Sequence, residues 1–298
     1  MTWVQLNIGL SRADGPVLEQ ARRVFDAVVP QLDEARAQGD LGRFHFMRKP
    51  PDIRLRLEGP APREHVLPKV EATLRRLREA GSVTAFAAGI YEPETRLFGG
   101  TRSMSLVHDY FDVDSRSWVD HDRLERLGAT RLSADDLTAR VVNDLFARTL
   151  DDRGEVWDTW CNVRQVVGDP VDEGQASGAQ PVAGNSADAA GRDPDPVPAG
   201  VALGGLVEEL DDGASAGEQE LLRRYRTANT RLATGLRGLA HHGELECGLR
   251  VLLPFVAVFH FHRFGLDRRR QAVQAQAMAQ AWDPRLGMRG GPSTGPGP

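Results

Sequence analysis

Hydrophobic and polar residues alternate along three short stretches near the start of the chain, as they do in β-strands that are buried on one face. The first stretch is residues 2–10, and the Ala-rich residues 83–91 also read as a strand. Between them, residues 44–57 hold two such runs, separated by Pro50 and Pro51, a pair that breaks regular structure. We therefore expect four strands in the amino-terminal part of the chain.

The segments between these strands repeat their apolar residues every three or four positions, which is the spacing of an amphipathic helix. One helix is expected over residues 16–38, with a kink or break at Pro30, because proline removes a backbone donor. A second helix is expected after Pro60, ending at Gly81. The order β-α-β-β-α-β predicts an α+β fold in which an antiparallel-rich sheet packs against helices.

Helical periodicity dominates the rest of the chain. A helix is expected around Met104 to Phe111, and another begins after Ser133, a residue suited to the N-cap. Further helices are expected at 217–243 and 268–282, and the apolar run 249–262 is a buried helix or strand. The carboxy-terminal half should therefore be helical.

An abrupt change of composition divides the chain. Residues 168–200 are Gly, Ala, Pro, Asp, Ser and Gln with almost no large apolar side chain, which predicts a disordered loop or linker. A short helix is expected at 203–210, and the Gly- and Pro-rich residues 287–298 should be a disordered tail. Residues 1–167 then form the α+β half, and 201–286 form the helical half that completes the same domain.

Composition excludes several classes of protein. The chain has 298 residues and a net charge of -5, which argues against nonspecific nucleic-acid binding. No apolar run has the length of a membrane span, and the amino terminus lacks a signal-peptide pattern. Cys161 and Cys247 have neither metal-site nor disulfide-framework spacing. We expect a cytoplasmic protein without a cofactor or metal and without direct contact to nucleic acid or membrane.

One strand carries candidate chemistry. Ile53, Leu55 and Leu57 share one face, so Arg54 and Arg56 lie side by side on the other. Two adjacent guanidinium groups can bind a carboxylate or oxyanion, although a polar sheet face exposed to solvent gives the same pattern. His260, at the end of an apolar run, is either a packed core residue or a proton carrier.

Four blocks of the sequence resemble, in order, a family of peptide-modifying proteins. It is the stand-alone, thiopeptide-type relative of the C-terminal glutamate-elimination domain of class I lanthipeptide dehydratases. The likeness covers roughly residues 1–120 and 215–285. The blocks are Phe46-Met-Arg-Lys-Pro-Pro-Asp-Ile-Arg-Leu-Arg56, Tyr91-Glu-Pro-Glu-Thr-Arg-Leu-Phe-Gly-Gly100, Asp114-Ser-Arg116 and Phe259-His-Phe-His-Arg-Phe-Gly-Leu266.

The resemblance implies a lyase that acts on a glutamylated precursor peptide. In that family a separate protein first transfers glutamate from glutamyl-tRNA to Ser or Thr, and elimination then gives dehydroalanine or dehydrobutyrine. The partners implied are the precursor peptide, the tRNA-dependent glutamylation protein and a possible second copy in a homodimer. The implied catalytic residues are Arg54, Arg56, Glu94 and His260, and the implied substrate-binding residues are Arg48, Arg96 and Arg263.

Two departures from the family pattern keep other functions open. The position that holds an Arg in lanthipeptide dehydratases is Leu97 here, and the Asn of the histidine block is His262. One alternative is a thiopeptide pyridine synthase, which joins two dehydroalanines in a formal [4+2] cycloaddition. Another is a non-catalytic scaffold that binds the leader peptide along a sheet edge, for which residues 2–10 are the candidate.

Overall fold

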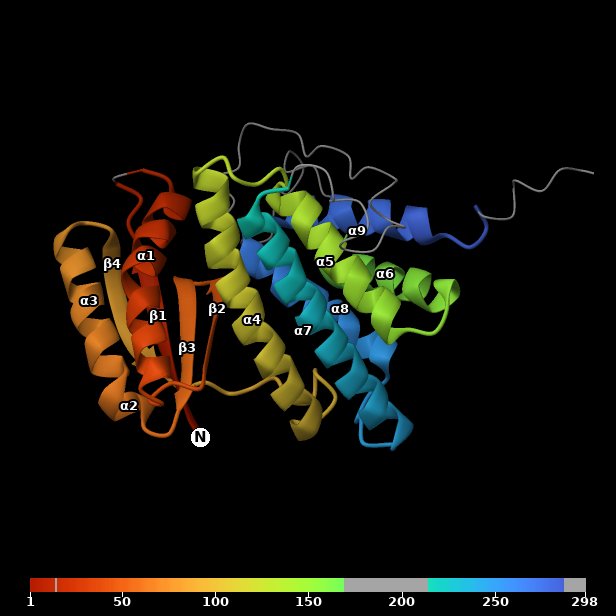
Figure 1. Cartoon of the computed structure of the whole chain (residues 1–298), viewed down its shortest axis with the longest axis horizontal. Helices are drawn as coiled ribbons and strands as arrows, with labels where there is room; N and C mark the ends of the chain where they lie inside the picture. The colour runs from red at the N-terminus through yellow and green to blue at the C-terminus, as the bar shows by residue number, and fades with distance from the viewer. Residues whose placement is uncertain (14, 169–213, 287–298) are drawn as a thin grey trace, which may run out of the picture.

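The computed structural model describes residues 1–13, 15–168 and 214–286, and its amino-terminal part is built on one four-stranded sheet (Figure 1). The strands are β1 (Thr2–Leu10), β2 (Arg43–Lys49), β3 (Asp52–Gly59) and β4 (Val83–Gly89). Their order across the sheet is β2-β3-β1-β4, and each neighbouring pair is antiparallel. The predicted α+β class and the β-α-β-β-α-β order are confirmed.

The helices of this first part are α1 (Val17–Ala37), α2 (Pro62–His65) and α3 (Leu67–Glu79). Helix α1 packs on the apolar face of the sheet, where the rings of Phe25 and Phe46 lie 4.3 Å apart between centroids. The expectation of a break at Pro30 was wrong, because α1 runs through that residue. The buried side chains on either side of Pro30, Val28, Val29 and Leu32, stabilise the helix through packing.

The second part consists of helices that stack beside the sheet (Figure 1). Residues 249–262, expected as a helix or a strand, are helical. The N-cap at Ser133 is confirmed, since its side chain accepts a hydrogen bond from the backbone N–H of Asp136. The elements are α4 (Thr101–Arg126), α5 (Ala134–Thr149), α6 (Arg153–Val167), α7 (Ala216–His241), α8 (Leu249–Phe264) and α9 (Arg268–Trp282).

Some expectations cannot be compared with the described residues. The linker beyond residue 168, the short helix at 203–210 and the tail at 287–298 all lie outside them. Within the described ranges, none of the helices combines the length and hydrophobicity that a bilayer span requires.

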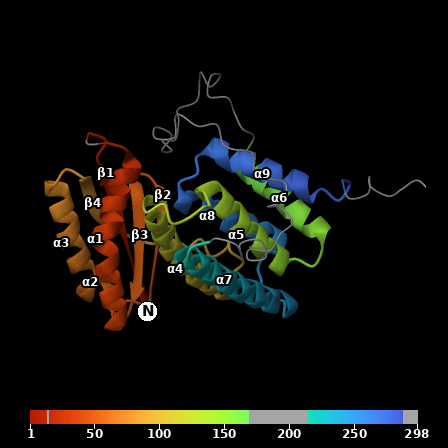
Figure 2. The ribbon, with the colours of Figure 1, turned by 45° about the horizontal axis from the view of Figure 1, so that its top comes forward.

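The outer edge of β2 is covered by α4, which lies between the sheet and the other helices in both views (Figure 2). The backbone N–H of Phe44 donates to Asp112 at 2.9 Å, and that of Phe46 donates to the hydroxyl of Ser115 at 3.2 Å. Strand β1 lies in the interior of the sheet, between β3 and β4. The expectation that residues 2–10 form a peptide-binding edge was therefore wrong, and β4 is the other edge.

The face of the sheet opposite α1 divides into two zones. Over β2 and β3, side chains from α4 and from the segment after β4 cover the polar residues, so that Arg56 is only 4% exposed. Over β4 the face is open, and Ala85 and Ala87 are exposed, whereas Asn7 of β1 is half-buried. Arg54 and Arg56, the pair predicted from the sequence, lie in the covered zone where it borders the open zone.

We expect Asp112→Ala to lower the free energy of unfolding by about 1–3 kcal/mol, because the Phe44 N–H at the covered edge loses its acceptor. Asp112 also accepts from Arg36 at 2.6 Å, so that guanidinium loses its partner as well. Urea unfolding followed by circular dichroism measures the change. Asp109→Ala is the control, because Asp109 lies on the same helix but its side chain is 40% exposed and pairs only with the partly exposed Arg43, so its loss should cost less than about 1 kcal/mol. Equal effects for the two variants would contradict this account of the edge.

Candidate active site

Arg54 and Arg56 share the polar face of β3, as predicted, but their surroundings differ. Arg56 is almost fully buried: its Nε donates to Gln5 at 2.9 Å, and its Nη1 lies 3.2 Å from Nε2 of His45. Arg54 is only half-buried, and its Nε donates to the carbonyl of Pro50 at 3.0 Å. Arg56 is therefore a fixed cation, while Arg54 lies where a ligand can reach it.

Arg56 also contacts the segment that follows β4. Its guanidinium stacks on the ring of Tyr91, 4.2 Å from the centroid, and its Nη2 lies 3.9 Å from Oε1 of Glu94. Burial lowers the pKa of Arg56, while Tyr91 and Glu94 raise it. An arginine keeps its charge at neutral pH under such shifts. Arg56 and Glu94, predicted separately from two blocks of the sequence, are thus brought together.

A group of aromatic and imidazole side chains forms the wall beside Arg56. Trp3 contacts His45, Tyr91 and His108, and the hydroxyl of Tyr91 lies 2.8 Å from Nε2 of His108. Burial lowers the pKa of His108 to about 3 and raises the pKa of Tyr91. Burial and Arg56 likewise lower the pKa of His45. These three groups are uncharged at neutral pH, so they add hydrogen-bonding capacity without adding charge.

His260 and Arg263 are held by a buried carboxylate, Asp114, which begins one of the four sequence blocks but was given no role there. Nδ1 of His260 lies 2.7 Å from Oδ1 of Asp114, and Nη1 of Arg263 donates to Oδ2 at 2.6 Å. The hydroxyl of Tyr225 donates to Oδ1 at 2.8 Å. Asp114, Arg263, His260 and Tyr225 are completely buried. This buried cluster joins α4, α7 and α8.

The buried cluster is connected to Arg56 through one aromatic ring. The guanidinium of Arg263 lies 4.0 Å from the centroid of Phe111, and that ring lies 5.5 Å from His45, which contacts Arg56. His260 belongs to the same connected group, but it has no exposed surface. Its Nε2 has no hydrogen-bond partner among the described residues.

Lys49 is a candidate that the sequence analysis missed. It is half-buried, and its Nζ lies 5.1 Å from the centroid of Phe259 on α8. Burial lowers its pKa, and Arg54 and Arg56 lower it further, whereas Glu94 raises it. A signal was present in the composition: in a chain whose basic residues are almost all Arg, only positions 49 and 69 are Lys. A lysine with a lowered pKa can act as a base.

Two of the proposed substrate-binding residues lie apart from this group. Arg48 points to the opposite face of β2, where its guanidinium lies 4.5 Å from the ring of Trp118 and burial lowers its pKa to about 10. Arg96 is exposed, in the turn before α4. His262, at the position where the family has Asn, is half-buried, and burial and Lys49 lower its pKa to about 4.

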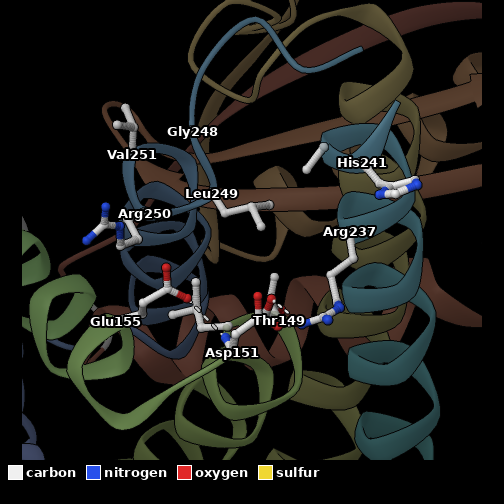
Figure 3. A pocket seen from close by; sticks show the side chains of 11 residues that line it. Thr149, Asp151, Glu155, Arg237, His241, Gly248, Leu249, Arg250 and Val251 are labelled. Carbon is white, nitrogen blue, oxygen red and sulfur yellow. Dashed lines mark hydrogen bonds and ion pairs between the residues drawn. The ribbon is translucent and has the colours of Figure 1, made fainter. Parts of the chain in front are cut away.

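A separate cavity of about 540 Å³ lies between the amino-terminal end of α8, the carboxy-terminal end of α7 and the loop after α5 (Figure 3). None of the residues selected from the sequence lines it. Its two arginines are paired with acids: Arg237 bonds to Asp151 at 2.6 Å, and Arg250 bonds to Asp158 at 3.0 Å. These ion pairs leave little net charge for binding an anionic ligand.

Among the residues that the structure describes, no group of His, Cys, Asp and Glu side chains has an arrangement that could hold a metal ion. The group around Arg56 instead brings three basic side chains, Lys49, Arg54 and Arg56, to one sheet face beside Glu94. Such a site can bind a carboxylate and stabilise negative charge that develops on oxygen.

The geometry defines an α+β protein with a cationic site on one face of its sheet. Residues 3–282 match the family described as lantibiotic biosynthesis dehydratase C-term. The chain belongs to this family, as the motif blocks indicated. No curated protein sequence matches the chain.

Solved structures with the same fold include the tRNA-dependent lantibiotic dehydratase MibB from Microbispora sp. 107891. The similarity has a TM-score of 0.66 at 17% identity and covers 97% of this chain but 28% of the MibB chain. TsrL is similar with a TM-score of 0.56 at 15% identity, covering 96% of both chains. TbtD, the pyridine synthase from thiomuracin biosynthesis, has a TM-score of 0.52 at 17% identity, covering 95% of this chain and 98% of TbtD.

We expect Asp114→Asn to lower the free energy of unfolding at pH 7 by about 3–5 kcal/mol, because it leaves Arg263 buried without its counter-charge. Burial alone would raise the pKa of Asp114, but His260, Arg263 and Tyr225 lower it below its ordinary value of 3.8. The stabilisation from the charged carboxylate is therefore present above that value and is lost as the pH falls through the lower pKa of the folded state.

Urea unfolding of both proteins at neutral and acidic pH measures this dependence. The difference between wild type and Asp114→Asn should shrink once the pH falls below about 4. The matched control is Asp120→Asn on the same helix, whose side chain is 38% exposed. A constant difference at every pH would show that the charge of Asp114 does not stabilise the fold.

Proposed function

We propose that this chain acts in the biosynthesis of a ribosomally made, post-translationally modified peptide, by β-elimination of glutamate from glutamylated Ser or Thr. The C–H bond at Cα of the modified residue breaks, its electron pair forms the Cα=Cβ double bond, and glutamate leaves from Cβ as a carboxylate. The products are dehydroalanine or dehydrobutyrine. The observation that carries the proposal is the convergence of Lys49, Arg54 and Arg56 beside Glu94 on one sheet face.

The two arginines have complementary roles in this mechanism. The half-buried Arg54 binds the leaving carboxylate, because its guanidinium can be reached from the open zone of the sheet. The buried Arg56, held by Gln5 and His45, stabilises the negative charge that forms on the carbonyl oxygen when the Cα proton is removed. Glu94 holds the Arg56 side chain in place. Arg96, which is exposed, is proposed to contact the peptide. Arg263 is fully buried against Asp114 and is proposed to act on the site only through the ring of Phe111. Arg48 has no supporting contact in this zone.

Two groups can carry the proton. Lys49 is half-buried beside the arginines, and its lowered pKa increases the fraction of neutral amine. His260 can act through Nε2 only if the bound peptide opens a path to that atom, since the side chain is fully buried. We therefore propose Lys49 as the group that removes the Cα proton and His260 as a second proton carrier that is reached after the peptide binds.

A pyridine synthase is the second candidate. TbtD, a pyridine synthase, and TsrL match this chain over nearly their whole lengths, which supports this alternative. Cycloaddition between two dehydroalanines has no glutamate to release and therefore no leaving carboxylate for Arg54 to bind. A non-catalytic scaffold would have no use for a lysine with a lowered pKa. The proposal also includes a separate glutamylation protein, the cytoplasm as its location and a homodimer as its assembly.

We expect Arg54→Ala and Arg56→Lys to lower kcat for glutamate release by about 10²–10³, the usual cost of removing one donor from an anion-stabilising site. The assay incubates a glutamylated precursor peptide with the protein and follows loss of glutamic acid by mass spectrometry. Arg223→Ala is the matched control, because this exposed residue on α7 pairs only with the neighbouring Glu220. If the wild type leaves the glutamylated peptide unchanged but cyclises a peptide that carries dehydroalanines, the second candidate replaces the first.

We expect Lys49→Arg to lower kcat by about 10²–10⁴, because it keeps the charge but cannot supply a neutral amine. For the wild type, the rate should rise with pH, since the base must lose its proton, and the rise should lie below the ordinary lysine pKa of 10.5. The pH profiles of wild type, Lys49→Arg and His260→Gln distinguish the two carriers. Full activity of Lys49→Arg would show that His260, and not Lys49, removes the Cα proton.

A further inference from the structure

The outer edge of β4 is the free edge of the sheet within the described residues. The strand reads Val-Thr-Ala-Phe-Ala-Ala-Gly, without a charge or a proline. Thr84, Ala85, Ala87 and Ala88 are exposed, and Ile90, just after the strand, is 81% exposed. A row of unpaired backbone donors and acceptors with small side chains on both sides can accept another extended chain.

The two edges of this sheet differ in whether their backbone groups have hydrogen-bond partners. At β2, the N–H groups of Phe44 and Phe46 bond to side chains of α4. Natural proteins usually protect a free edge with lysines, prolines, bulges or a covering element. Along β4 the one irregularity is a shift of register beside Gly9 and Leu10 of β1, at the start of β4. The remainder of the edge is a regular strand.

We infer that the edge of β4 binds an extended, acidic segment of the peptide substrate as a fifth strand. This inference rests on the proposed function only in taking the substrate to be a peptide. We infer that the bound segment is acidic because α3, the helix that packs beside β4 (Figure 1), is basic. Helix α3 carries four basic residues and two acidic ones, Lys69, Arg75, Arg76 and Arg78 against Glu71 and Glu79, on a chain whose net charge is -5.

One of these basic residues lies at the strand itself. The guanidinium of Arg78 is 5.7 Å from the centroid of Phe86, the middle residue of β4. On the opposite face, Ala87 pairs with Asn7 of β1, and Asn7 pairs with Arg54 of β3. A strand added to β4 would alternate its side chains between these faces. Acidic side chains on the one face would meet Arg78, and those on the other would lie over the alanines.

The same row of residues leads from the edge to the proposed active site. Neighbouring strands lie about 4.8 Å apart, so Arg54 would be about 14 Å from a strand added beside β4. About five extended residues span that distance. A substrate bound at β4 through one segment can therefore place a later residue at Arg54 across the open zone. Separating the two positions lets one docking segment serve several modified residues.

A second copy of the chain is the other occupant that a free edge can accept. Pairing of two β4 strands about a twofold axis would bring the two α3 helices to the same side of a continuous sheet. Their basic residues, four on each helix, would then face one another, and like charges at such a junction oppose association. The charge pattern therefore favours an acidic peptide over self-pairing.

Hydrogen–deuterium exchange on the full chain tests the inference. The probes are a capped synthetic peptide of alternating Val and Glu, the same peptide with Gln in place of Glu, and the precursor peptide of the proposed reaction. We expect the Val-Glu peptide and the precursor to slow exchange in residues 83–89, and the Gln peptide to bind at least tenfold more weakly. Arg78→Glu and Ala87→Asp should each weaken binding tenfold or more, measured by fluorescence anisotropy.

Arg223→Glu on α7 is the matched charge reversal and should leave binding unchanged. Arg54→Ala and Arg56→Lys should bind normally while losing turnover, so failure of the proposed reaction and failure of this inference give different results. Three outcomes would overturn the inference: no protection of β4 by the Val-Glu peptide or the precursor, equal binding of the Gln peptide, or protection that appears without peptide and grows with protein concentration. The last would assign the edge to a dimer.

Discussion

A single buried carboxylate joins three helices of the second part of the molecule to one another. Asp114 of α4 receives hydrogen bonds from Tyr225 of α7 and from His260 and Arg263 of α8. All four side chains are fully buried, so no solvent can replace a missing partner. A buried ion pair adds little stability compared with a hydrophobic contact of the same size, but breaking it is costly. The network therefore favours one arrangement of these three helices over others.

That arrangement sets the electrostatics of the sheet face. Arg263 is directed to the ring of Phe111, and Phe111 supports His45 and through it Arg56. Burial keeps the neighbouring imidazoles of His45 and His108 uncharged. Positive charge is therefore concentrated on Arg54, Arg56 and Lys49, where the covered zone of the sheet meets the open one. An anion approaching from the open zone encounters cations that solvent screens only partly.

The sequence predicted helices and strands correctly where apolar residues recur at a regular spacing. The four strands, their order and most helix positions follow from apolar spacing alone, and the Arg54 and Arg56 pair follows from alternation. The prediction of a break at Pro30 was wrong because packing around this residue outweighs the loss of one backbone hydrogen bond. The contacts across long separations were not predictable: nothing near Asp114 in the sequence indicates that residues 225, 260 and 263 converge on it. Arg48 is a different case, because alternation along the strand places it on the face of Phe44 and Phe46 and not on that of Arg56.

The coverage of β2 by α4 limits how large an assembly this sheet can form. A sheet with two free edges can add copies at both and grow without end, as in fibrils. Here Asp112 and Ser115 occupy the donors of one edge, so only the β4 side can add a strand. Two copies of the chain that pair through β4 use the free edge of both sheets, so that pairing closes at two partners. A protein that handles extended peptides at an uncharged strand thus avoids open-ended polymerisation.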